Sequence, residues 1–274
     1  MTKTSLAASS QQEQAPIASY NSFLQNLAQS LDVVLVAPRN PLNIGAAARA
    51  MANFGFPHLT VAAPYAPHWR EAKSAVGAPQ VLANASQTAS LAEALAHCTF
   101  VAGTGTLAHR KPEQEVVPLI KLAPRLLQEI SSGGRAALVF GPEKHGLTRD
   151  DLSYCHALVE IPTDPRQPSM NLGQAVAVCL YEVCRSVDTR SRPGNIQGMD
   201  EAGHRPADGA ALERLGELIE ETLGAADYSP EIMRDANRHD LRLLLRRLNL
   251  TARDTRRILG IFRRILWRLR RSGR

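Results

Sequence analysis

No apolar run in the sequence approaches the roughly 18 residues that a membrane-spanning helix requires. The four cysteines form no C-x-x-C pair and no zinc-ligand spacing, which excludes the usual redox and zinc motifs. Residues 1–20 contain no apolar block, so the sequence indicates no secretory signal. We therefore expect a cytoplasmic protein with no bound metal and no membrane association, whose thiols are reduced and buried: Cys98, Cys155, Cys179 and Cys184.

Lysine is missing from residues 234–274, which hold 14 arginines and three acidic residues. This stretch carries a formal charge of +11 against +6 for the whole chain, which leaves −5 for residues 1–233. A cationic segment on an acidic body is typical of a protein that binds a polyanion. The charge distribution favours a nucleic acid over a membrane, because Phe262 and Trp267 are the only aromatic residues of the stretch.

The chain has room for one large domain and a smaller second unit, since it has 274 residues of which 44% are hydrophobic. Short apolar runs predict buried strands at 32–37, 59–63, 99–102, 136–140 and 158–161. Helical spacing lies between these runs, at 43–54, 91–96, 119–130 and 171–187, and Gly55 is typical of a helix end. Buried strands that alternate with helices predict an α/β fold with a parallel sheet.

The domain organisation follows from changes in composition along the chain. Residues 1–28 read as a disordered tail, 29–187 as the α/β body, and 188–209 as a linker rich in Arg, Pro, Gly and Asp. Residues 210–274 form an arginine-rich extension with helices expected at 212–223, 241–248 and 251–269. An extension of this size is expected to pack on the body or on a second subunit.

The segment from Gly103 to Ala108 follows a strand and has the outline G-x-G-x-x-A of a dinucleotide-binding loop. Two strand–helix units precede it, however, and no acidic residue ends the next strand, as that fingerprint requires. An oxidoreductase that binds NAD(P) is therefore kept as an alternative. The favoured interpretation is a glycine-rich loop that faces some other ligand.

The segment from Gly141 to Thr148 nearly matches the phosphate-binding loop G-x-x-x-x-G-K-[ST]. Leu147 stands where the phosphate-binding lysine belongs, so an ATPase would lack its central contact. The two glycines still indicate that the backbone approaches something closely at a strand end. The carboxyl ends of strands are where open α/β sheets bind ligands.

The segment from Ile161 to Gly173 is a loop with three prolines that leads into a helix. Proline lowers the entropy of the free loop, which suits a preorganised pocket wall. Either Ser169 or Asn171 would cap the helix that begins at Leu172.

Three ordered segments carry a specific resemblance: Asn43-Ile-Gly-Ala-Ala-Ala-Arg49-Ala-Met, Leu138-Val-Phe-Gly-Pro-Glu-Lys-His-Gly-Leu147, and Ile161-Pro-Thr followed by Ser169-Met-Asn-Leu-Gly-Gln-Ala-Val. They resemble the three motifs of the SpoU/TrmH branch of the SPOUT superfamily of RNA 2′-O-ribose methyltransferases. The resemblance implies a parallel-sheet SPOUT fold whose C-terminal part forms a deep trefoil knot. It also implies S-adenosyl-L-methionine as cofactor and a homodimer with sites at the interface.

The order of body, linker and helical extension is similar to the TrmJ type of this family. That similarity implies methylation of tRNA, at the cytidine or uridine of position 32 in the anticodon loop. The alternatives are ribosomal RNA or another tRNA position as substrate, and a non-catalytic RNA-binding protein.

The resemblance also assigns site residues. Arg49 is the family's catalytic candidate, and Asn43, Glu143 and Asn171 would orient the ribose and the loops. A guanidinium is a poor base, so we expect Arg49 to bind the adjacent phosphate and stabilise the developing alkoxide, while a phosphate oxygen or water accepts the proton. From the residues alone, the less favoured alternative for Arg49 is an exposed helix cation, whereas Glu143 could equally be an acid at a helix N-terminus.

The expected cofactor-binding residues come from the Gly103 segment and from the segments that begin at Gly141 and Ile161: Thr104, Gly105, Gly141, Glu143, Gly146, Leu147, Ile161, Ser169, Met170, Asn171 and Leu172. The expected RNA-binding residues are cations outside these loops: Arg39, Arg110, Arg246, Arg257 and Arg264. Their contacts should go mainly to phosphate and should therefore be sensitive to salt.

Overall fold

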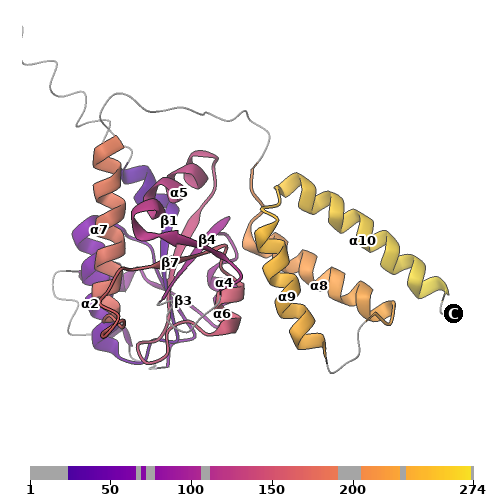
Figure 1. The fold of residues 1–274 in the computed structure, drawn as a ribbon, viewed down its shortest axis with the longest axis horizontal. Helices are drawn as coiled ribbons and strands as arrows, with labels where there is room; N and C mark the ends of the chain where they lie inside the picture. The colour runs from indigo at the N-terminus through magenta and orange to yellow at the C-terminus, as the bar shows by residue number, and fades with distance from the viewer. Residues whose placement is uncertain are drawn as a thin grey trace, which may run out of the picture.

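A seven-stranded parallel sheet forms the centre of the body (Figure 1). The structure, a computed structural model, describes residues 24–65, 69–71, 78–105, 112–190, 205–228 and 233–272. The strands run in the order β3-β2-β1-β6-β4-β7-β5. Their bounds are β1 Leu31–Val36, β2 Leu59–Ala62, β3 Ser86–Thr88, β4 Phe100–Thr104, β5 Glu115–Pro118, β6 Ala136–Phe140 and β7 Ala157–Glu160.

The central strands are buried along their whole length, because helices cover both faces of the sheet. Every residue of β1, β4 and β6 is buried, as expected for parallel strands between two layers. Leu31 and Val33 of β1 face the layer formed by α2 (Pro41–Phe54), α5 (Leu119–Ser131) and α7 (Leu172–Arg190). Val34 and Val36 face the opposite side, towards α4 (Leu91–Ala94) and α6 (Arg149–Ser153).

Helices α2 and α7 cross closely where small residues meet. A Cβ placed on Gly173 would lie 2.6 Å from the Cβ of Ala46, so only glycine allows this approach. Asn40 caps the start of α2, and Gly55 ends it with a left-handed φ of 78°. The alanine-rich spacing of residues 43–54 thus serves a close helix–helix contact. That contact brings Asn43, near the start of α2, next to the start of α7.

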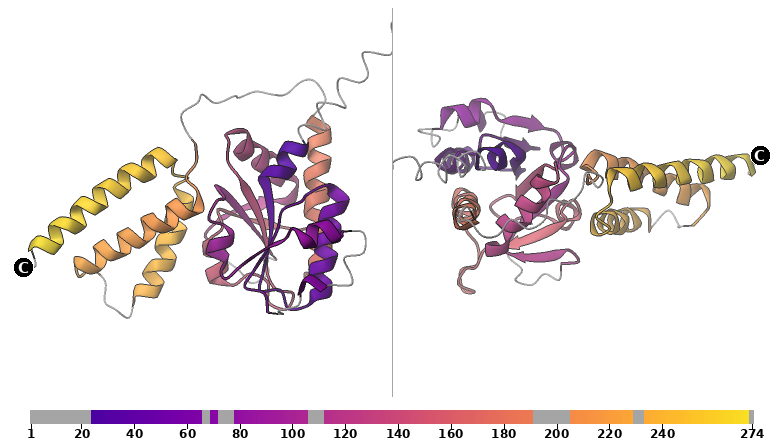
Figure 2. Two further views of the ribbon diagram at one scale, coloured as in Figure 1. Left: turned by 180° about the vertical axis from the view of Figure 1, so that it is seen from behind. Right: turned by 90° about the horizontal axis from the view of Figure 1, so that it is seen from above.

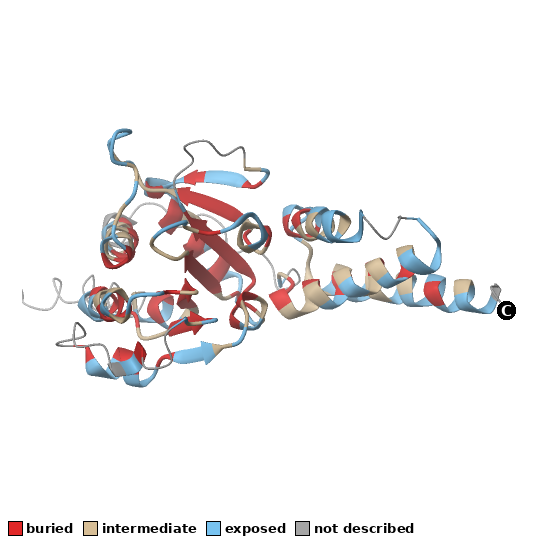
Figure 3. Cartoon of the chain, turned by 90° about the horizontal axis from the view of Figure 1, so that it is seen from below, coloured by how far each residue is buried: buried red, intermediate tan, exposed pale blue. Residues whose placement is uncertain are grey.

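The C-terminal extension is a separate three-helix unit beside the body (Figures 1 and 2). It consists of α8 (Gly209–Ala225), α9 (Arg234–Arg247) and α10 (Ala252–Ser272), and its own small core contains Leu215, Ile219 and Leu245. Burial is concentrated in the sheet of the body and occurs only at isolated positions along the extension (Figure 3). Backbone hydrogen bonds from Gly209 and Ala210 to Cys98 and Ala96 join the two units.

The sequence-based boundaries need correction at both ends of the body. Residues 24–30 form a helix and Leu27 is only 1% exposed, because it packs into the main core; the tail expected at 1–28 is thus too long. Helix α7 continues to Arg190 and α8 begins at Gly209, so both cut into the linker expected at 188–209. Residues 191–204 of that linker and residues 1–23 lie outside the described residues, whereas 205–208 are described.

Other expectations have mixed outcomes. The parallel α/β sheet and the helical extension are confirmed. Strands β3 and β5, the short helix α3 (Pro79–Ala83) and the 3-10 turn η1 (Trp69–Glu71) were not predicted. The four cysteines are free, and all but Cys184 are fully buried. The trefoil knot stays a prediction. In the described part of the chain, no helix has the length and apolar character needed to cross a membrane.

Candidate active site

The three sequence motifs meet at one edge of the sheet. In a parallel sheet the loops that follow the strands all emerge at the carboxyl edge. The segments after β1, β6 and β7 therefore lie together, and they contain Asn43, Glu143 and Asn171 respectively. The end of β4 lies between the loops that follow β6 and β7, because β4 is their common neighbour in the sheet.

A hydrogen-bond chain connects one residue from each motif. The side-chain amide of Asn171 donates to Oδ1 of Asn43 over 3.0 Å. The amide of Asn43 in turn donates to Oε1 of Glu143 over 2.7 Å. Because both amides of the chain are directed by these bonds, the orientation of the Glu143 carboxylate is fixed. Its Oε2 has no hydrogen-bond partner among the residues that the structure describes, and it can accept a further bond.

Asn171 also caps α7. Its Oδ1 accepts hydrogen bonds from the backbone amides of Gly173 (2.9 Å) and Gln174 (3.4 Å). Ser169 is exposed and makes no capping bond, so the choice left open by the sequence falls on Asn171. The same side chain therefore begins the helix and enters the hydrogen-bond chain of the site.

The loop from Gly141 to Leu147 folds back over the end of β6. A side chain on Gly141 would overlap the backbone of Gly146 and Leu147, so the close approach predicted for this glycine is made by the loop itself. Gly146 has a φ of 64° and donates from its amide to the carbonyl of Pro142 over 2.8 Å. Leu147 is buried in the second core cluster, which anchors the loop to the body.

The end of β4 combines packed and open positions. Thr104 is buried and donates from its hydroxyl to the carbonyl of Val139 over 3.0 Å. The space at Gly103 is filled, because a Cβ there would lie 2.7 Å from the Cys155 sulfur and 3.1 Å from Leu147. At Gly105, by contrast, a Cβ would meet no heavy atom of the described residues within 4 Å. Among the described residues, the strand end at Gly105 is therefore free of close neighbours.

The loop after β7 has an internal turn and supplies partly buried side chains to the same edge. Asp164 binds the guanidinium of Arg166 through both carboxylate oxygens, at 3.0 and 2.7 Å, which rigidifies the proline-rich segment. Ile161 and Met170 are partly buried, and Leu172 is buried. All the residues expected to bind a cofactor thus belong to the loops after β6 and β7 and to the end of β4, at the carboxyl edge.

Arg49 lies on α2, six residues beyond Asn43. It is exposed and has no hydrogen bond or ion pair with any described residue. Six helical residues advance about 9 Å along the axis and turn about 120° from the starting face. Within one chain, Arg49 therefore points away from the Asn43 side chain and presents an unpaired cation on the surface of α2.

The arginines expected to bind RNA fall into different environments. Arg39, Arg257 and Arg264 are exposed, and Arg39 and Arg264 stack on Tyr65 (5.4 Å) and Trp267 (4.4 Å). The expectation for Arg246 is wrong, because this side chain is 3% exposed. Its guanidinium forms an ion pair with Glu213 and donates a hydrogen bond to the Tyr154 carbonyl. Arg110 lies outside the described residues.

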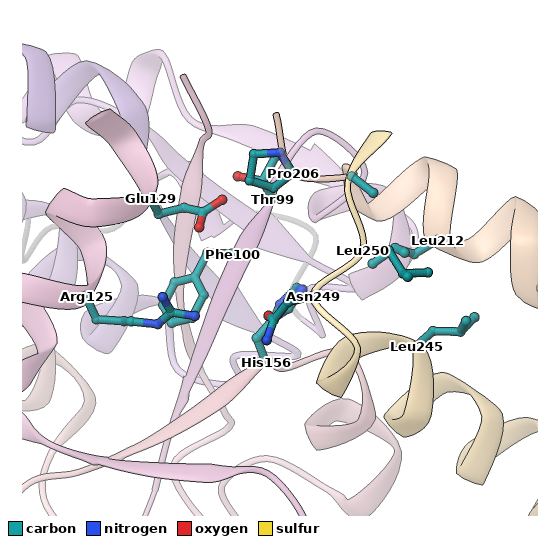
Figure 4. A pocket seen from close by; sticks show the side chains of 11 residues that line it. Thr99, Phe100, Arg125, Glu129, His156, Pro206, Leu212, Leu245, Asn249 and Leu250 are labelled. Atoms are coloured by element: carbon teal, nitrogen blue, oxygen red, sulfur yellow. The ribbon is translucent and has the colours of Figure 1, made fainter. Parts of the chain in front are cut away.

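A cavity of about 220 Å³ lies at a different place, between the body and the extension (Figure 4). Arg125 and Glu129 of α5 line it from one side and Leu245 and Asn249 from the other. His156 forms part of its wall, accepts a hydrogen bond from the backbone amide of Val101 over 3.1 Å, and has its pKa lowered to about 3 by burial. Because this cavity adjoins the start of β4, it is separate from the carboxyl edge.

A buried acid occupies the same amino-terminal edge. Burial alone would raise the pKa of Asp32, but the hydrogen bond from His97 (2.6 Å) and the charge of Arg135 (3.1 Å) hold it below its ordinary value. The Cys98 sulfur lies 3.6 Å from the same carboxylate. Asp32, His97 and Cys98 are close enough to hold a metal ion, yet Arg135 already compensates the charge of Asp32. The expectation of no metal stays a prediction.

Comparisons with known proteins agree with this arrangement. The model of the SpoU rRNA Methylase family matches residues 30–181, which contain all three motifs. A tRNA (cytidine/uridine/adenosine-2′-O-)-methyltransferase TrmJ of Pseudomonas aeruginosa is 41% identical over 152 residues, which are 55% of this chain but only 59% of that protein. A tRNA (cytidine/uridine-2′-O-)-methyltransferase TrmJ of Pectobacterium atrosepticum is 34% identical over 238 residues, which are 86% of this chain and 95% of that protein.

The fold comparison covers the extension as well. The crystal structure of TrmJ from Z. mobilis ZM4 superposes with a TM-score of 0.73 at 28% identity, over 85% of this chain and 98% of that one. A probable methyltransferase from Bordetella pertussis Tohama I gives 0.54 at 28% identity, over 60% and 99%. With its motifs joined at the carboxyl edge of a parallel sheet and its helical extension shared with TrmJ, the chain belongs to the SpoU family of RNA methylases.

Proposed function

We propose that this protein transfers the methyl group of S-adenosyl-L-methionine to a ribose 2′-hydroxyl of tRNA, at nucleotide 32 of the anticodon loop. The observation that carries the proposal is the hydrogen-bond chain from Asn171 through Asn43 to Glu143, which joins the three family motifs into one site. The substrate class is supported by the TrmJ relatives, whose similarity includes the extension. We further propose that the protein acts in the cytoplasm, where a tRNA substrate would be available to it.

The carboxyl edge fits the cofactor. Gly105 directly follows β4, between the loops after β6 and β7, and the loop after β7 carries the apolar side chains of Ile161, Met170 and Leu172. Adenine needs apolar walls together with main-chain donors and acceptors, which these loops provide. When bound, S-adenosyl-L-methionine supplies an electrophilic sulfonium methyl group. Thr104, Gly141, Gly146 and Leu147 would shape the pocket through their backbone.

The protein's own contribution is mainly positioning and charge stabilisation. The Glu143 carboxylate, directed by Asn43, can accept a hydrogen bond from the ribose and orient its 2′-hydroxyl. Arg49 stays protonated and binds the phosphate next to the target ribose, where it stabilises the alkoxide as the O–H bond weakens. A phosphate oxygen or a water molecule accepts the proton, because a guanidinium cannot.

A homodimer would complete this site. Arg49 points away from Asn43 within one chain, so a second copy packed on the α2–α7 layer is a natural source of the cation. Leu42 and Tyr181 on this layer are 54% and 56% exposed, and Tyr181 packs edge-on against Phe54. Light scattering tests this: Tyr181→Glu should give a monomer, whereas Tyr228→Glu, at a still more exposed tyrosine of the extension, should leave a dimer. A dimer in both variants would place the interface elsewhere.

The exposed arginines outside the site would bind the tRNA backbone. Arg39, Arg257 and Arg264 keep their guanidinium groups at the surface, and α10 presents further exposed arginines at 253, 256, 263 and 268. Contacts of this kind position the RNA without reading its sequence.

The function is tested by ligand titration and product analysis. Calorimetry should detect binding of S-adenosyl-L-methionine but not of NAD, and mass spectrometry should find ribose methylation in tRNA incubated with the protein and cofactor. Methylation of ribosomal RNA alone would overturn the substrate assignment. RNA binding without cofactor binding would indicate a non-catalytic relative.

A further inference from the structure

The loop expected to hold the cofactor continues directly into the helix that the extension touches. Leu147, the last residue of that loop, is buried, and Thr148 begins α6 through a reciprocal pair of capping bonds with Asp151. Helix α6 is only five residues long, so it has little stability of its own. Its position therefore depends on what packs against it.

Arg242 of α9 makes several contacts with α6 and with the residue that follows it. Its Nη1 donates to Oδ1 of Asp150 over 3.0 Å and to the hydroxyl of Ser153 over 2.9 Å. The guanidinium also stacks on the ring of Tyr154 at 4.1 Å. The side chain is only 12% exposed, so these contacts are made largely out of water. One residue of the extension thus contacts three residues that follow the loop.

Polar contacts contribute to the attachment of the extension to the body. Leu215, Ile219 and Leu245 form a core separate from the two clusters of the body. Between the two units lies the cavity of about 220 Å³ rather than a continuous apolar interface. Where apolar packing is interrupted in this way, a partly buried arginine with several partners has a large share in holding the elements together.

We infer that Arg242 is a positioning residue for the cofactor site. By holding α6 against the body, it keeps the loop from Gly141 to Leu147 folded back over the end of β6. This inference rests on the proposed function for the role of the loop. It gives the extension a second task besides RNA binding, because a helix of the extension would support the cofactor pocket of the same chain.

The decisive comparison is Arg242→Gln against Arg214→Gln in the full chain. Arg214 is exposed on α8 and has no partner among the described residues, so its substitution removes the same charge without the contact. Amide hydrogen exchange reports on the loop directly, because the Gly146 amide is protected by its bond to Pro142. In Arg242→Gln we expect about tenfold faster exchange at Gly146 and in α6, with β1 unchanged; Arg214→Gln should exchange like the parent protein.

Cofactor affinity supplies the second readout. Calorimetry should show S-adenosyl-L-methionine binding weakened about fivefold to tenfold by Arg242→Gln, within the usual range for coupling between sites, and unaffected by Arg214→Gln. Asp150 is an exposed partner of Arg242, so Asp150→Asn should not disturb folding. This variant should also speed amide exchange in the loop and weaken cofactor binding, but less than Arg242→Gln does. Arg242→Lys should be intermediate, since it keeps the charge but loses the planar stacking.

Unchanged amide exchange of the loop in both Arg242→Gln and Asp150→Asn would overturn the inference. Exchange that becomes faster throughout the protein, including β1, would also overturn it, because it would indicate general destabilisation. Failure of the proposed function is distinguishable, because a parent protein that binds no S-adenosyl-L-methionine would refute the function while the exchange data still decide the role of Arg242.

Discussion

Asn171 donates a hydrogen bond to Asn43 across 128 residues of sequence and at the same time caps the helix that it begins. The bond is possible because Gly173 lets α7 approach α2 at Ala46. A local capping interaction and a long-range contact of the site are thus made by one side chain. Changes at Asn171 should therefore affect stability and activity together.

Replacing Asn171 with Ala should lower the free energy of unfolding by about 1 kcal/mol or more, the usual cost of a lost cap. Ser169→Ala should leave it unchanged, because Ser169 is exposed and does not cap α7. Thermal unfolding of the two variants gives the comparison. Equal destabilisation by both would show that the cap is not formed by Asn171.

Arg49→Ala should lower kcat by about a hundredfold to a thousandfold, the range seen when one group that stabilises transition-state charge is removed. Affinity for S-adenosyl-L-methionine should stay nearly the same, because Arg49 is not part of the loops that would bind it. Single-turnover kinetics and calorimetry measure the two quantities. If cofactor affinity fell in proportion to activity, Arg49 would belong to the cofactor pocket instead.

Arg257→Gln combined with Arg264→Gln should reduce the slope of log tRNA affinity against log salt by roughly 1.4 to 1.8, since each lost phosphate contact removes about 0.7 to 0.9. Arg214→Gln provides the matched control for charge. Fluorescence titration of tRNA between low and high salt measures the slopes. The same slope in the double variant and in the control would assign these arginines to something other than RNA.

His156 should make the protein less stable as the pH falls. Its pKa of about 3 in the folded protein lies below the value of about 6.5 expected in the unfolded chain. Between these two values the unfolded chain binds the additional proton, so the free energy of unfolding decreases as the pH drops, by about 2 kcal/mol from pH 6.5 to 5.

The variant His156→Asn tests this effect, because the Asn side-chain oxygen can replace Nδ1 as the acceptor for the Val101 amide. Urea unfolding measures the free energy of unfolding at pH 6.5 and at pH 5. The decrease between these two pH values should be smaller for the variant than for the parent protein. An equal difference would mean that other groups cause the acid sensitivity.

The sequence predicted the central strands and the long helices, because buried apolar runs and helical periodicity are local signals. It did not predict β3 and β5, which form the edges of the sheet and are largely exposed; Ser86–Thr88 and Glu115–Pro118 contain no continuous apolar run. The helix at 24–30 was missed because only Leu27 and Ala28 are buried in it.

The site residues were found through the three motifs, whereas their connections were not. Nothing local indicates that Asn43 joins Glu143 to Asn171, because these residues come from three segments that lie far apart in the sequence. Arg246 shows the same limit in the extension: its sequence context resembles that of Arg257, but its position on α9 directs it into the contact with Tyr154 and Glu213. A charge pattern gives the sign of a surface and cannot tell which of its members are buried.

The most direct measurement uses an unmodified tRNA transcript and a matched transcript with a 2′-deoxyribose at nucleotide 32. With the protein and labelled S-adenosyl-L-methionine, the first should be methylated at the ribose of nucleotide 32 and the second should incorporate no label. Equal incorporation into both transcripts, or none into either, would contradict methyl transfer to the 2′-hydroxyl of this nucleotide.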